Sequence, residues 1–170
     1  MSIFETQGSQ SLDISDENFS SENIFEEFID SCFFDKVNFI GCCFEESEFI
    51  GVNFNFCRFE NCIFKNTIIR KSEITDCEFK NCQFLESQIS PRINFFRTLF
   101  MNSEFSNVDF SFTYFYHCRF IEISLNTIKF KGTSFINPKT EKVTFDILEF
   151  DEVEPMQIKI TNSLSLPKKI

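Results

Sequence analysis

A large apolar residue returns at every fifth position through most of this chain, and that period constrains the fold more than any other feature. The series runs from Phe19 to Ile89, resumes one residue out of phase at Phe95, and ends at Phe135. It has 24 positions, of which 18 are Phe. On a helix each step of five rotates a side chain by about 140°, and in a flat strand successive members point to opposite faces. The backbone must therefore turn once per repeat, as it does in a solenoid.

Two further positions of the five-residue unit follow the same period. A small or β-branched residue stands two positions before the large one, for example Cys42, Val52 and Cys62. Gly or Asn often stands two positions after it, for example Gly41 and Asn61. Small and large residues together fill a narrow interior densely, and Gly and Asn tolerate the positive φ that tight corners need. All three registers therefore indicate the same turning backbone.

These units resemble those of the pentapeptide-repeat family, in which a small residue, a polar residue, Leu or Phe, and two mostly polar residues follow one another. Examples are residues 42–46 (CCFEE), 52–56 (VNFNF) and 82–86 (CQFLE). The resemblance covers about residues 30–137. It implies an all-β fold, a right-handed quadrilateral parallel β-helix with four pentapeptides per coil. About six coils at a spacing of roughly 4.8 Å would form a rod about 29 Å long, and we expect short caps at both ends.

The pattern divides the chain into three segments. We expect the β-helix to span residues 31–137, with a break in phase near residues 90–94 where Ser90-Pro91-Arg92 should bulge or bend one coil edge. Residues 1–30 form an acidic N-terminal segment and cap, and residues 138–170 form a closing segment or tail after the turn Ile136-Asn137-Pro138.

The N-terminal cap is predicted to contain a short helix or an irregular coil over residues 21–31. Here Glu17, Glu22 and Glu27 occupy the small inward register, which disfavours a regular coil. Ser20 or Ser21 would provide the N-cap. A stripe at helical spacing follows these serines: Ile24, Phe25, Phe28, Ile29 and Cys32.

Residues twenty apart should stack on one face of a square coil. The square coil that the resemblance implies therefore predicts core stacks with these members: Phe39, Phe59 and Phe79; Phe44, Phe64 and Phe84; Cys42, Cys62 and Cys82. The spacing of the cysteines is that of the repeat, not the Cys-x2-Cys spacing usual in zinc sites. We interpret them as buried, reduced thiols, which suits a reducing compartment and predicts a cytoplasmic protein.

No residue pattern indicates catalysis. The only histidine, His117, falls at a solvent-facing corner, and the chain has no Gly-rich phosphate loop, metal-ligand cluster or cofactor fingerprint. We therefore expect no enzymatic activity, no cofactor and no metal. The longest apolar stretch is too short to span a membrane. A pI near 4.6 without a basic stripe argues against direct binding of nucleic acid.

Function should then lie on the walls or ends of the rod. The resemblance implies binding to bacterial type II topoisomerases, DNA gyrase or topoisomerase IV, by acidic rods that mimic duplex DNA and protect the enzyme from inhibitors such as quinolones. The candidate partner-binding residues are two groups of acids: Glu45, Glu46 and Glu48 as a local patch, and Glu22, Glu26 and Glu27 in the acidic N-terminal segment.

The distribution of charge limits this hypothesis. Residues 1–60 carry 13 acidic and two basic side chains, whereas residues 61–140 carry seven acidic and ten basic ones. From Asp30 to Asn137 the net charge is only −2. Duplex DNA of equal length, with one charge per roughly 1.7 Å, carries about 17 negative charges. The alternative hypothesis is a rigid scaffold or effector-type interaction module with an unrelated partner.

Two further contacts are expected. Pairing of two copies through a terminal end, as in some members of the family, would make a homodimer. Phe56 and Phe112 fall at outward corners, and Phe33 and Phe96 flank inward positions, so exposed aromatic side chains should mark a contact site.

Overall fold

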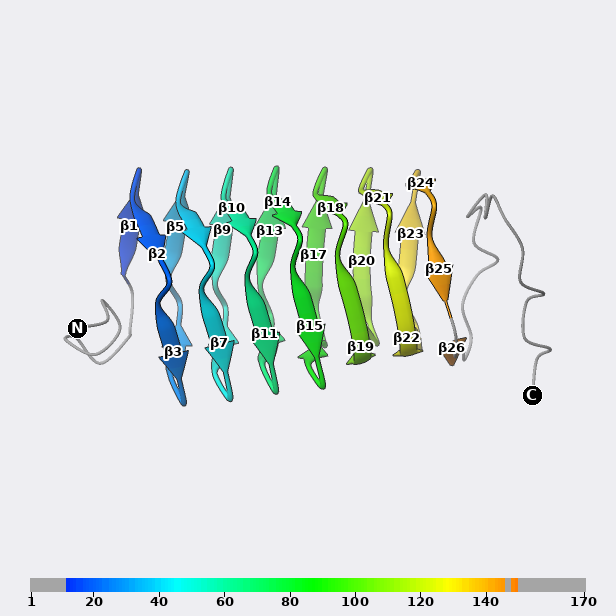
Figure 1. The fold of residues 1–170 in the computed structure, drawn as a ribbon, viewed down its shortest axis with the longest axis horizontal. Helices are drawn as coiled ribbons and strands as arrows, with labels where there is room; N and C mark the ends of the chain where they lie inside the picture. The colour runs from blue at the N-terminus through cyan, green and yellow to red at the C-terminus, as the bar shows by residue number, and fades with distance from the viewer. Residues whose placement is uncertain (1–11, 146–147, 150–170) are drawn as a thin grey trace.

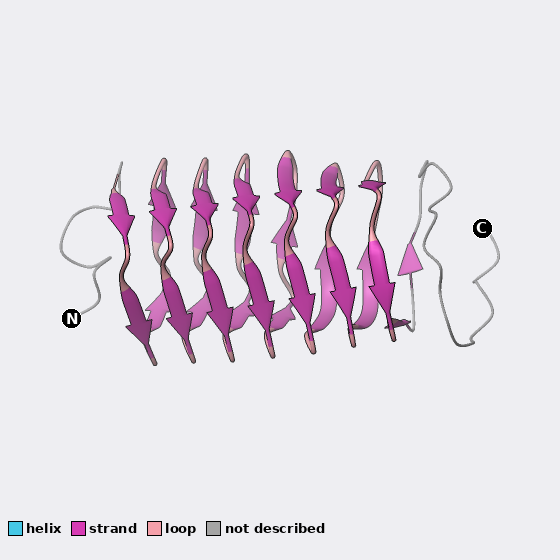
Figure 2. Ribbon diagram, turned by 90° about the horizontal axis from the view of Figure 1, so that it is seen from above, coloured by secondary structure: helices cyan, strands magenta, loops and turns pink. Residues whose placement is uncertain are grey.

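The computed structural model describes residues 12–145 and 148–149. These residues form 26 short β-strands and no helix, wound into a rod with four walls (Figures 1 and 2). Each pentapeptide contributes one strand to one wall, and the chain then turns a corner onto the next wall. The predicted quadrilateral parallel β-helix is confirmed.

Each wall is a stack of parallel strands, one from each coil. The first wall consists of β1 (Asp13–Ser15), β5 (Phe33–Asp35), β9 (Asn53–Asn55), β13 (Glu73–Thr75), β17 (Ile93–Phe96), β20 (Thr113–Tyr116) and β23 (Ser134–Ile136). The second wall consists of β2 (Asn18–Ser20), β6 (Asn38–Ile40), β10 (Arg58–Glu60), β14 (Glu78–Lys80), β18 (Leu99–Met101), β21 (Arg119–Ile121) and β24 (Lys139–Glu141).

The third and fourth walls are joined by two longer strands, β19 (Glu104–Asp109) and β22 (Ser124–Lys129), which run across the corner between them. The third wall also contains β3 (Asn23–Phe25), β7 (Cys43–Glu45), β11 (Ile63–Lys65), β15 (Gln83–Leu85) and β25 (Thr144–Phe145). The fourth wall also contains β4 (Phe28–Asp30), β8 (Glu48–Ile50), β12 (Ile68–Arg70), β16 (Gln88–Ile89) and β26 (Leu148–Glu149).

The corners explain why a unit of five residues is required. Except at the break in phase, where Arg92 takes this role, the residue two positions after each large apolar one has a positive φ, even where it is not glycine, as at Phe56 (52°) and Lys36 (54°). This left-handed conformation is unfavourable for residues with a side chain. It persists because the corner N–H donates a hydrogen bond to the next coil, as Phe56 does to Thr75 O at 3.0 Å. The corner thus turns the chain and keeps the ladder continuous.

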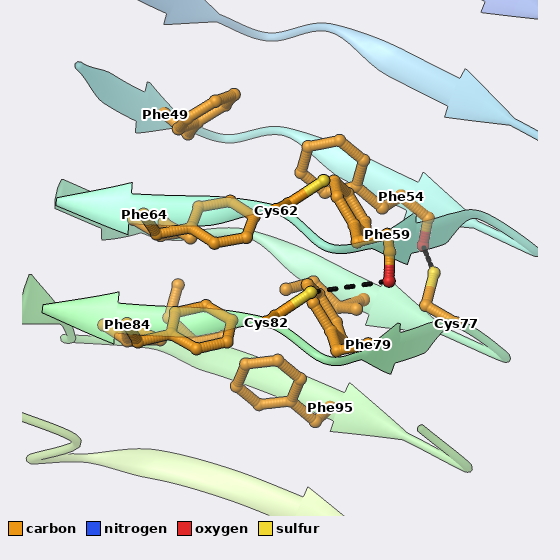
Figure 3. Packing of buried hydrophobic residues seen from close by; sticks show 14 of the residues in the cluster. Phe49, Phe54, Phe59, Cys62, Phe64, Cys77, Phe79, Cys82, Phe84 and Phe95 are labelled. Carbon is orange, nitrogen blue, oxygen red and sulfur yellow. Dashed lines mark hydrogen bonds between the residues drawn. The ribbon is translucent and has the colours of Figure 1, made fainter. Parts of the chain in front are cut away.

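Large side chains fill the interior in continuous stacks. Phe39, Phe59 and Phe79 lie directly above one another, with ring centroids 4.9 and 4.6 Å apart. Rings on neighbouring walls meet edge to face, as Phe39 and Phe44 do. Figure 3 shows how these rings and the thiols between them occupy the axis of the rod. Burial of such rings is the main force that closes the coil.

The predicted helix over residues 21–31 is wrong. Residues in this range form β3 and β4, and Ile24 and Ile29 are buried beside the next coil. The coil is held in register by backbone bonds, with Cys43 N donating to Glu22 O at 2.8 Å. Glu22 and Glu27 are tolerated in the small inward register because they belong to the outermost described coil, where their side chains are only half-buried.

The expected domain boundaries also change, because regular coils extend further at both ends. Residues 13–30 form a complete first coil instead of a cap. Beyond Pro138, β24 pairs with β21 at the usual offset of twenty, Arg119 beside Lys139. Asn137 has a positive φ (50°), as the other corner residues do, so the proline after it does not interrupt the repeat. Residues 1–11 and 150–170, the outer parts of the two predicted terminal segments, lie outside the described residues.

The break in phase lies at a corner of the rod. Strands pair at an offset of 20 residues before it, as Phe59 does with Phe79, and again after it, as Phe95 does with Phe115, whereas pairs that span it have an offset of 21, as Ile74 and Phe95 do. The extra residue falls in the segment between β16 and β17, where Arg92 has a φ of 62° and the Ser90–Pro91 peptide bond is cis. Pairing therefore continues on both sides of the insertion.

Candidate protein-binding site

The three acids of the predicted local patch surround one corner of the rod. Glu45 ends β7 on the third wall, Glu46 is the corner residue with a φ of 54°, and Glu48 begins β8 on the fourth wall. The structure thus brings all three together, but in three different environments.

Two of these acids are neutralised by the next coil. Lys65 Nζ lies 2.6 Å from Glu45 Oε1, and Arg70 Nη2 lies 2.6 Å from Glu48 Oε1. The hydrogen bond that Lys65 donates to Glu45 raises the pKa of Lys65, which keeps the pair charged. Of the patch, only Glu46 is exposed and has no ion-pair partner among the described residues.

The exposed acid belongs to a ridge of acidic corners. Glu26 and Glu86 occupy the same corner between the third and fourth walls, one coil before and two coils after Glu46, and both are exposed. Asn66 stands in the coil between Glu46 and Glu86. We call Glu26, Glu46 and Glu86 the acidic ridge. Sequence reasoning did not single out Glu86 or the ridge, although the spacing of 20 and 40 residues would have revealed it.

The first coil adds a further concentration of negative charge. Residues 12–31 contain seven acidic side chains and no lysine or arginine. The predicted residues Glu22 and Glu27 lie here, both half-buried; Glu27 follows Glu26 of the ridge, whereas Glu22 lies at the corner between the second and third walls. The six predicted acids therefore all lie in the first two coils, five of them at or beside the corner between the third and fourth walls and Glu22 at the neighbouring corner.

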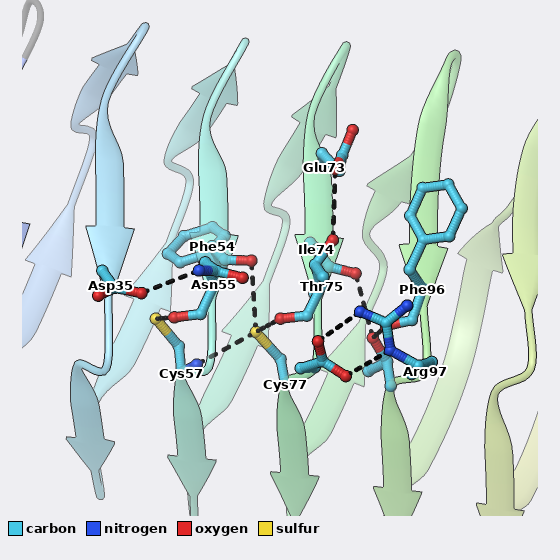
Figure 4. A network of polar contacts seen from close by, with 12 residues as sticks. Asp35, Phe54, Asn55, Cys57, Glu73, Ile74, Thr75, Cys77, Phe96 and Arg97 are labelled. Carbon is cyan, nitrogen blue, oxygen red and sulfur yellow. Dashed lines mark hydrogen bonds and ion pairs between the residues drawn. The ribbon is translucent and has the colours of Figure 1, made fainter.

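Elsewhere the walls are electrically balanced by pairing between coils. Arg97 donates two hydrogen bonds to Asp76, from Nε at 2.7 Å and from Nη2 at 2.5 Å (Figure 4). Lys142 pairs with Glu122 at 2.6 Å. Such pairs satisfy charge locally, so they leave no continuous negative wall along the rod.

A groove of about 460 Å³ runs along the corner between the second and third walls. Its amide groups bond to one another, since Asn102 donates to Asn81 at 2.7 Å and Asn81 donates to Asn61 at 3.0 Å. Gln83 contacts Glu104 at 3.4 Å in the same manner. These polar groups are engaged with each other, so they do not converge on a position for a reacting atom.

The cysteine column is part of the core. Cys42, Cys62 and Cys82 are buried, and each thiol contacts a backbone carbonyl of the preceding coil, as Cys62 Sγ does with Phe39 O at 3.3 Å. Cys57 Sγ contacts Phe34 O at 3.3 Å in the same way, and Cys77 Sγ contacts Phe54 O at 3.5 Å (Figure 4). The described residues contain no group of three or more His, Cys, Asp or Glu side chains that could hold a metal ion.

Two further expectations from the sequence concern the single histidine and membrane-spanning segments. His117 is an exposed corner residue with a φ of 54°. Within residues 12–145 and 148–149, no helix has the length and apolarity to cross a membrane.

Fold and repeat together define this chain as a β-solenoid repeat protein. The sequence profile of the family described as pentapeptide repeats matches residues 47–84 in 8 copies. Residues 47–84 therefore carry the repeats of the pentapeptide-repeat family. No curated protein sequence matches the chain.

Two solved structures illustrate the similarity. A pentapeptide repeat protein from the thylakoid lumen of Arabidopsis thaliana shares 15% identity with a TM-score of 0.54, over 61% of this chain and 70% of that chain. QnrB1, a plasmid-mediated fluoroquinolone resistance protein, shares 15% identity with a TM-score of 0.40, over 82% of this chain and 92% of that chain. The first of these similarities supports the β-helical fold.

Proposed function

We propose that this chain is a non-catalytic binding protein that presents the acidic ridge and the acidic first coil to a basic surface of a protein partner. The observation that supports it is the concentration of seven acids in a first coil that contains no lysine or arginine of its own, at one end of a rigid rod. The resemblance to the family makes bacterial DNA gyrase or topoisomerase IV the named candidate. The protein would act there as a partial DNA mimic that protects the enzyme from inhibitors.

The mimicry is confined to one edge and one end. Glu45 and Glu48 are neutralised by Lys65 and Arg70, and the region from Asp30 to Asn137 has a net charge of only −2. Duplex DNA carries one charge per roughly 1.7 Å along its whole length. We therefore expect weaker, more salt-sensitive binding than a fully acidic rod would give.

The absence of catalysis in this proposal rests on the packing of the interior. The inward side chains of successive coils stack in contact, so the axis of the rod is filled by rings, thiols and small residues. An enclosed apolar pocket with a few converging polar groups is the usual setting for substrate chemistry, and the core leaves no room for one.

The test is a gyrase supercoiling assay with the full chain, with and without a quinolone. We expect inhibition or drug protection at about low-micromolar protein, the range in which partly polar, non-obligate interfaces bind. Reversal of the ridge charges in a triple variant, Glu26→Lys, Glu46→Lys and Glu86→Lys, should abolish the effect. These side chains point outward from corners, so the variant should remain folded.

A matched control reverses three acids outside the ridge: Glu73→Lys, Glu78→Lys and Glu104→Lys. The net charge changes by the same amount, so retention of activity in this control would assign the effect to the ridge. No effect of the wild-type chain at about tens of micromolar would remove topoisomerases as partners at a meaningful affinity.

The second candidate function is a rigid scaffold with an unrelated protein partner. The observation that favours it is the pairing of charges between coils, exemplified by Asp76 and Arg97, which stiffens the walls without making them acidic. This second function is favoured if the full chain neither inhibits the topoisomerases nor protects them from a quinolone in the supercoiling assay.

A further inference from the structure

Exposed apolar side chains are concentrated on the first wall and its two corners. Among the described residues eight large hydrophobic side chains are exposed, and five of them lie here. These are Phe33 (37% exposed), Phe56 (54%), Phe112 (49%), Tyr114 (40%) and Ile136 (39%). Phe96 and Tyr116 of the same wall are partly exposed. Such a concentration on one flat face indicates an interaction surface.

The arrangement of the rings favours a protein partner over a stacked ligand. Phe96 and Tyr116 stack on one another, with centroids 4.8 Å apart and planes 9° apart. Rings stacked along the rod cover each other's faces and present their edges outward. Nucleic-acid bases bind to open ring faces, so this wall does not offer them a platform.

The positions of the aromatic residues are symmetric about the middle of the wall. The wall has seven strands in the order β1-β5-β9-β13-β17-β20-β23, so β13 is central. Phe33 lies on β5, the second strand, and Tyr114 lies on β20, the sixth. Both occupy the first outward position of their strands, because Phe33 precedes buried Phe34 as Tyr114 precedes buried Phe115.

We propose that two copies of this chain pair side by side and antiparallel through their first walls. A two-fold axis at β13, perpendicular to the rod, places each column of outward residues against the same column of the other copy, reversed in direction. The second strand of one copy then faces the sixth strand of the other. Phe33 meets Tyr114 of the other copy, and by symmetry this contact is made twice.

The same operation brings complementary polar groups together. Asp35 on β5 faces Tyr116 on β20, so the phenol hydroxyl donates a hydrogen bond to the carboxylate. Phe56, at the corner after β9, faces Arg97, at the corner after β17, which gives a cation–π contact. Figure 4 shows Asp35, Asn55, Thr75 and Phe96 along one column of this wall, with Arg97 at the adjacent corner.

Charge also favours the antiparallel direction over the parallel one. The acids Asp13 and Asp16 lie at the β1 end of the wall, and the basic corner residues Arg92 and Arg97 lie in its second half. A parallel pair would place Asp13 and Asp16 beside their own copies. An antiparallel pair separates these like charges, because it sets the β1 end against the β23 end.

The size of the wall sets the expected affinity. Five residues at about 3.3 Å across and seven strands at about 4.8 Å along make a face of about 550 Å². A standard stable interface covers about 800 Å² on each partner. The pair is therefore weak and reversible, with a dissociation constant on the order of 100 micromolar.

The central residue gives the most specific test. The axis at β13 brings Glu73 of one copy next to Glu73 of the other, where like charges oppose pairing. Glu73→Gln removes this repulsion, so it should strengthen the association by about threefold or more, measured by sedimentation equilibrium at low salt. An end-to-end dimer would not respond to this substitution, because Glu73 lies at mid-length.

Loss of the aromatic contact should act in the opposite direction. Phe33→Ser and Tyr114→Ser should each weaken the association by about tenfold, because each change removes two symmetric contacts. The matched control is Phe25→Ser on the third wall, where Phe25 is 53% exposed, and it should leave the association unchanged. Circular dichroism checks that each variant stays folded.

Small-angle X-ray scattering of the full chain separates the arrangements. Side-by-side pairing increases the cross-section and keeps the maximum dimension nearly that of one rod, whereas end-to-end pairing nearly doubles that dimension. A chain that stays monomeric up to about 500 micromolar, five times the expected constant, overturns the proposal. The proposal is also overturned if the dissociation constant does not change in the variants Phe33→Ser, Tyr114→Ser and Glu73→Gln.

Discussion

The ring of Phe59 lies parallel to the ring of Phe79 in the next coil, with centroids 4.6 Å apart and planes 2° apart. Phe39 continues the stack on the other side at 4.9 Å. These residues are twenty apart in sequence and adjacent in space, because four pentapeptides complete one turn. Each ring therefore has a ring above it, a ring below it, and rings on neighbouring walls at its edges.

Removal of one ring from this stack should be costly. Phe59→Ala creates a cavity between Phe39 and Phe79, and we expect a loss of about 3–5 kcal/mol in the free energy of unfolding, measured by chemical denaturation. The control is Phe56→Ala, because Phe56 is 54% exposed at a corner and should change stability little. A loss below about 1 kcal/mol at Phe59 would contradict its place in a packed stack.

Gly132 should be more sensitive to alanine than the other corner glycines. Both Gly132 (φ 61°) and Gly41 (φ 64°) are left-handed, so alanine costs about 1–2 kcal/mol at either. A Cβ on Gly132 would lie 2.7 Å from Phe112 Cδ1, whereas at Gly41 the nearest atom, Ser21 Oγ, is 3.7 Å away. Gly132→Ala should therefore cost about 1 kcal/mol more, as the Phe112 ring leaves its rotamer.

A double variant isolates that contact. In the Phe112→Ala background the extra cost of Gly132→Ala should disappear, and its thermal and denaturant midpoints should shift no more than those of Gly41→Ala. An unchanged difference between the two glycines in this background would exclude the ring as its cause.

The buried thiols should react slowly. Burial raises the pKa of Cys118 to about 12, so its reactive thiolate is scarce at neutral pH. Cys43 is only half-buried and should be modified first in a short pulse of N-ethylmaleimide read by mass spectrometry. If N-ethylmaleimide modified Cys118 as rapidly as Cys43, the coil around Cys118 would have to open.

The small inward positions should accept serine in place of cysteine. Cys62 Sγ contacts Phe39 O at 3.3 Å, and Ser87 Oγ makes the corresponding bond to Phe64 O at 3.2 Å. Cys62→Ser should therefore cost less than about 1 kcal/mol and leave the metal content unchanged. Stoichiometric zinc in the wild-type protein would overturn the interpretation of these thiols as core.

The pair of Asp76 and Arg97 should make stability depend on acid pH. The guanidinium of Arg97 lowers the pKa of Asp76 by its hydrogen bonds and charge. A depressed pKa stabilises the fold above the unfolded value of about 3.9, and this contribution is lost as pH falls through the folded value. The pair is exposed, so it contributes no more than about 1 kcal/mol.

Arg97→Gln tests this assignment. The carboxyl carbon of Asp76, followed by NMR between about pH 7 and pH 2, should titrate near about 3.9 in the variant and lower in the wild type. The stability difference between the two proteins should shrink in acid. Equal titration in both proteins would mean that the pair does not form in solution.

Much of the architecture follows from the period of five. The repeat separates the members of the stacks Phe39–Phe59–Phe79 and Cys42–Cys62–Cys82 by twenty residues. One turn of the coil also takes twenty residues, so each member lies directly above the one before it. The first coil escaped prediction because Glu22 and Glu27 break the small register there. A glutamate in the middle of a coil stack would be buried, whereas at the outermost described coil it reaches solvent.

The candidate site was less accessible to sequence reasoning. Composition located the acids Glu45, Glu46 and Glu48, but it did not show that Lys65 and Arg70 neutralise two of them. Those partners are twenty and twenty-two residues away, so their proximity depends on the coil geometry. The ridge of Glu26, Glu46 and Glu86 was missed for a different reason, because the stacking expected of residues twenty apart was applied to the core and not to the corners.

The sequence by itself determined that this protein is a filled solenoid, because a fivefold repeat of small, large and corner residues permits few other backbones, and its resemblance to the pentapeptide-repeat family implied the four walls. The tertiary structure alone decided which charges remain free and which aromatic residues share a wall. Such surface relationships join residues of different coils. They depend on the number of residues per turn, on the one-residue shift near Arg92, and on which corner each side chain occupies.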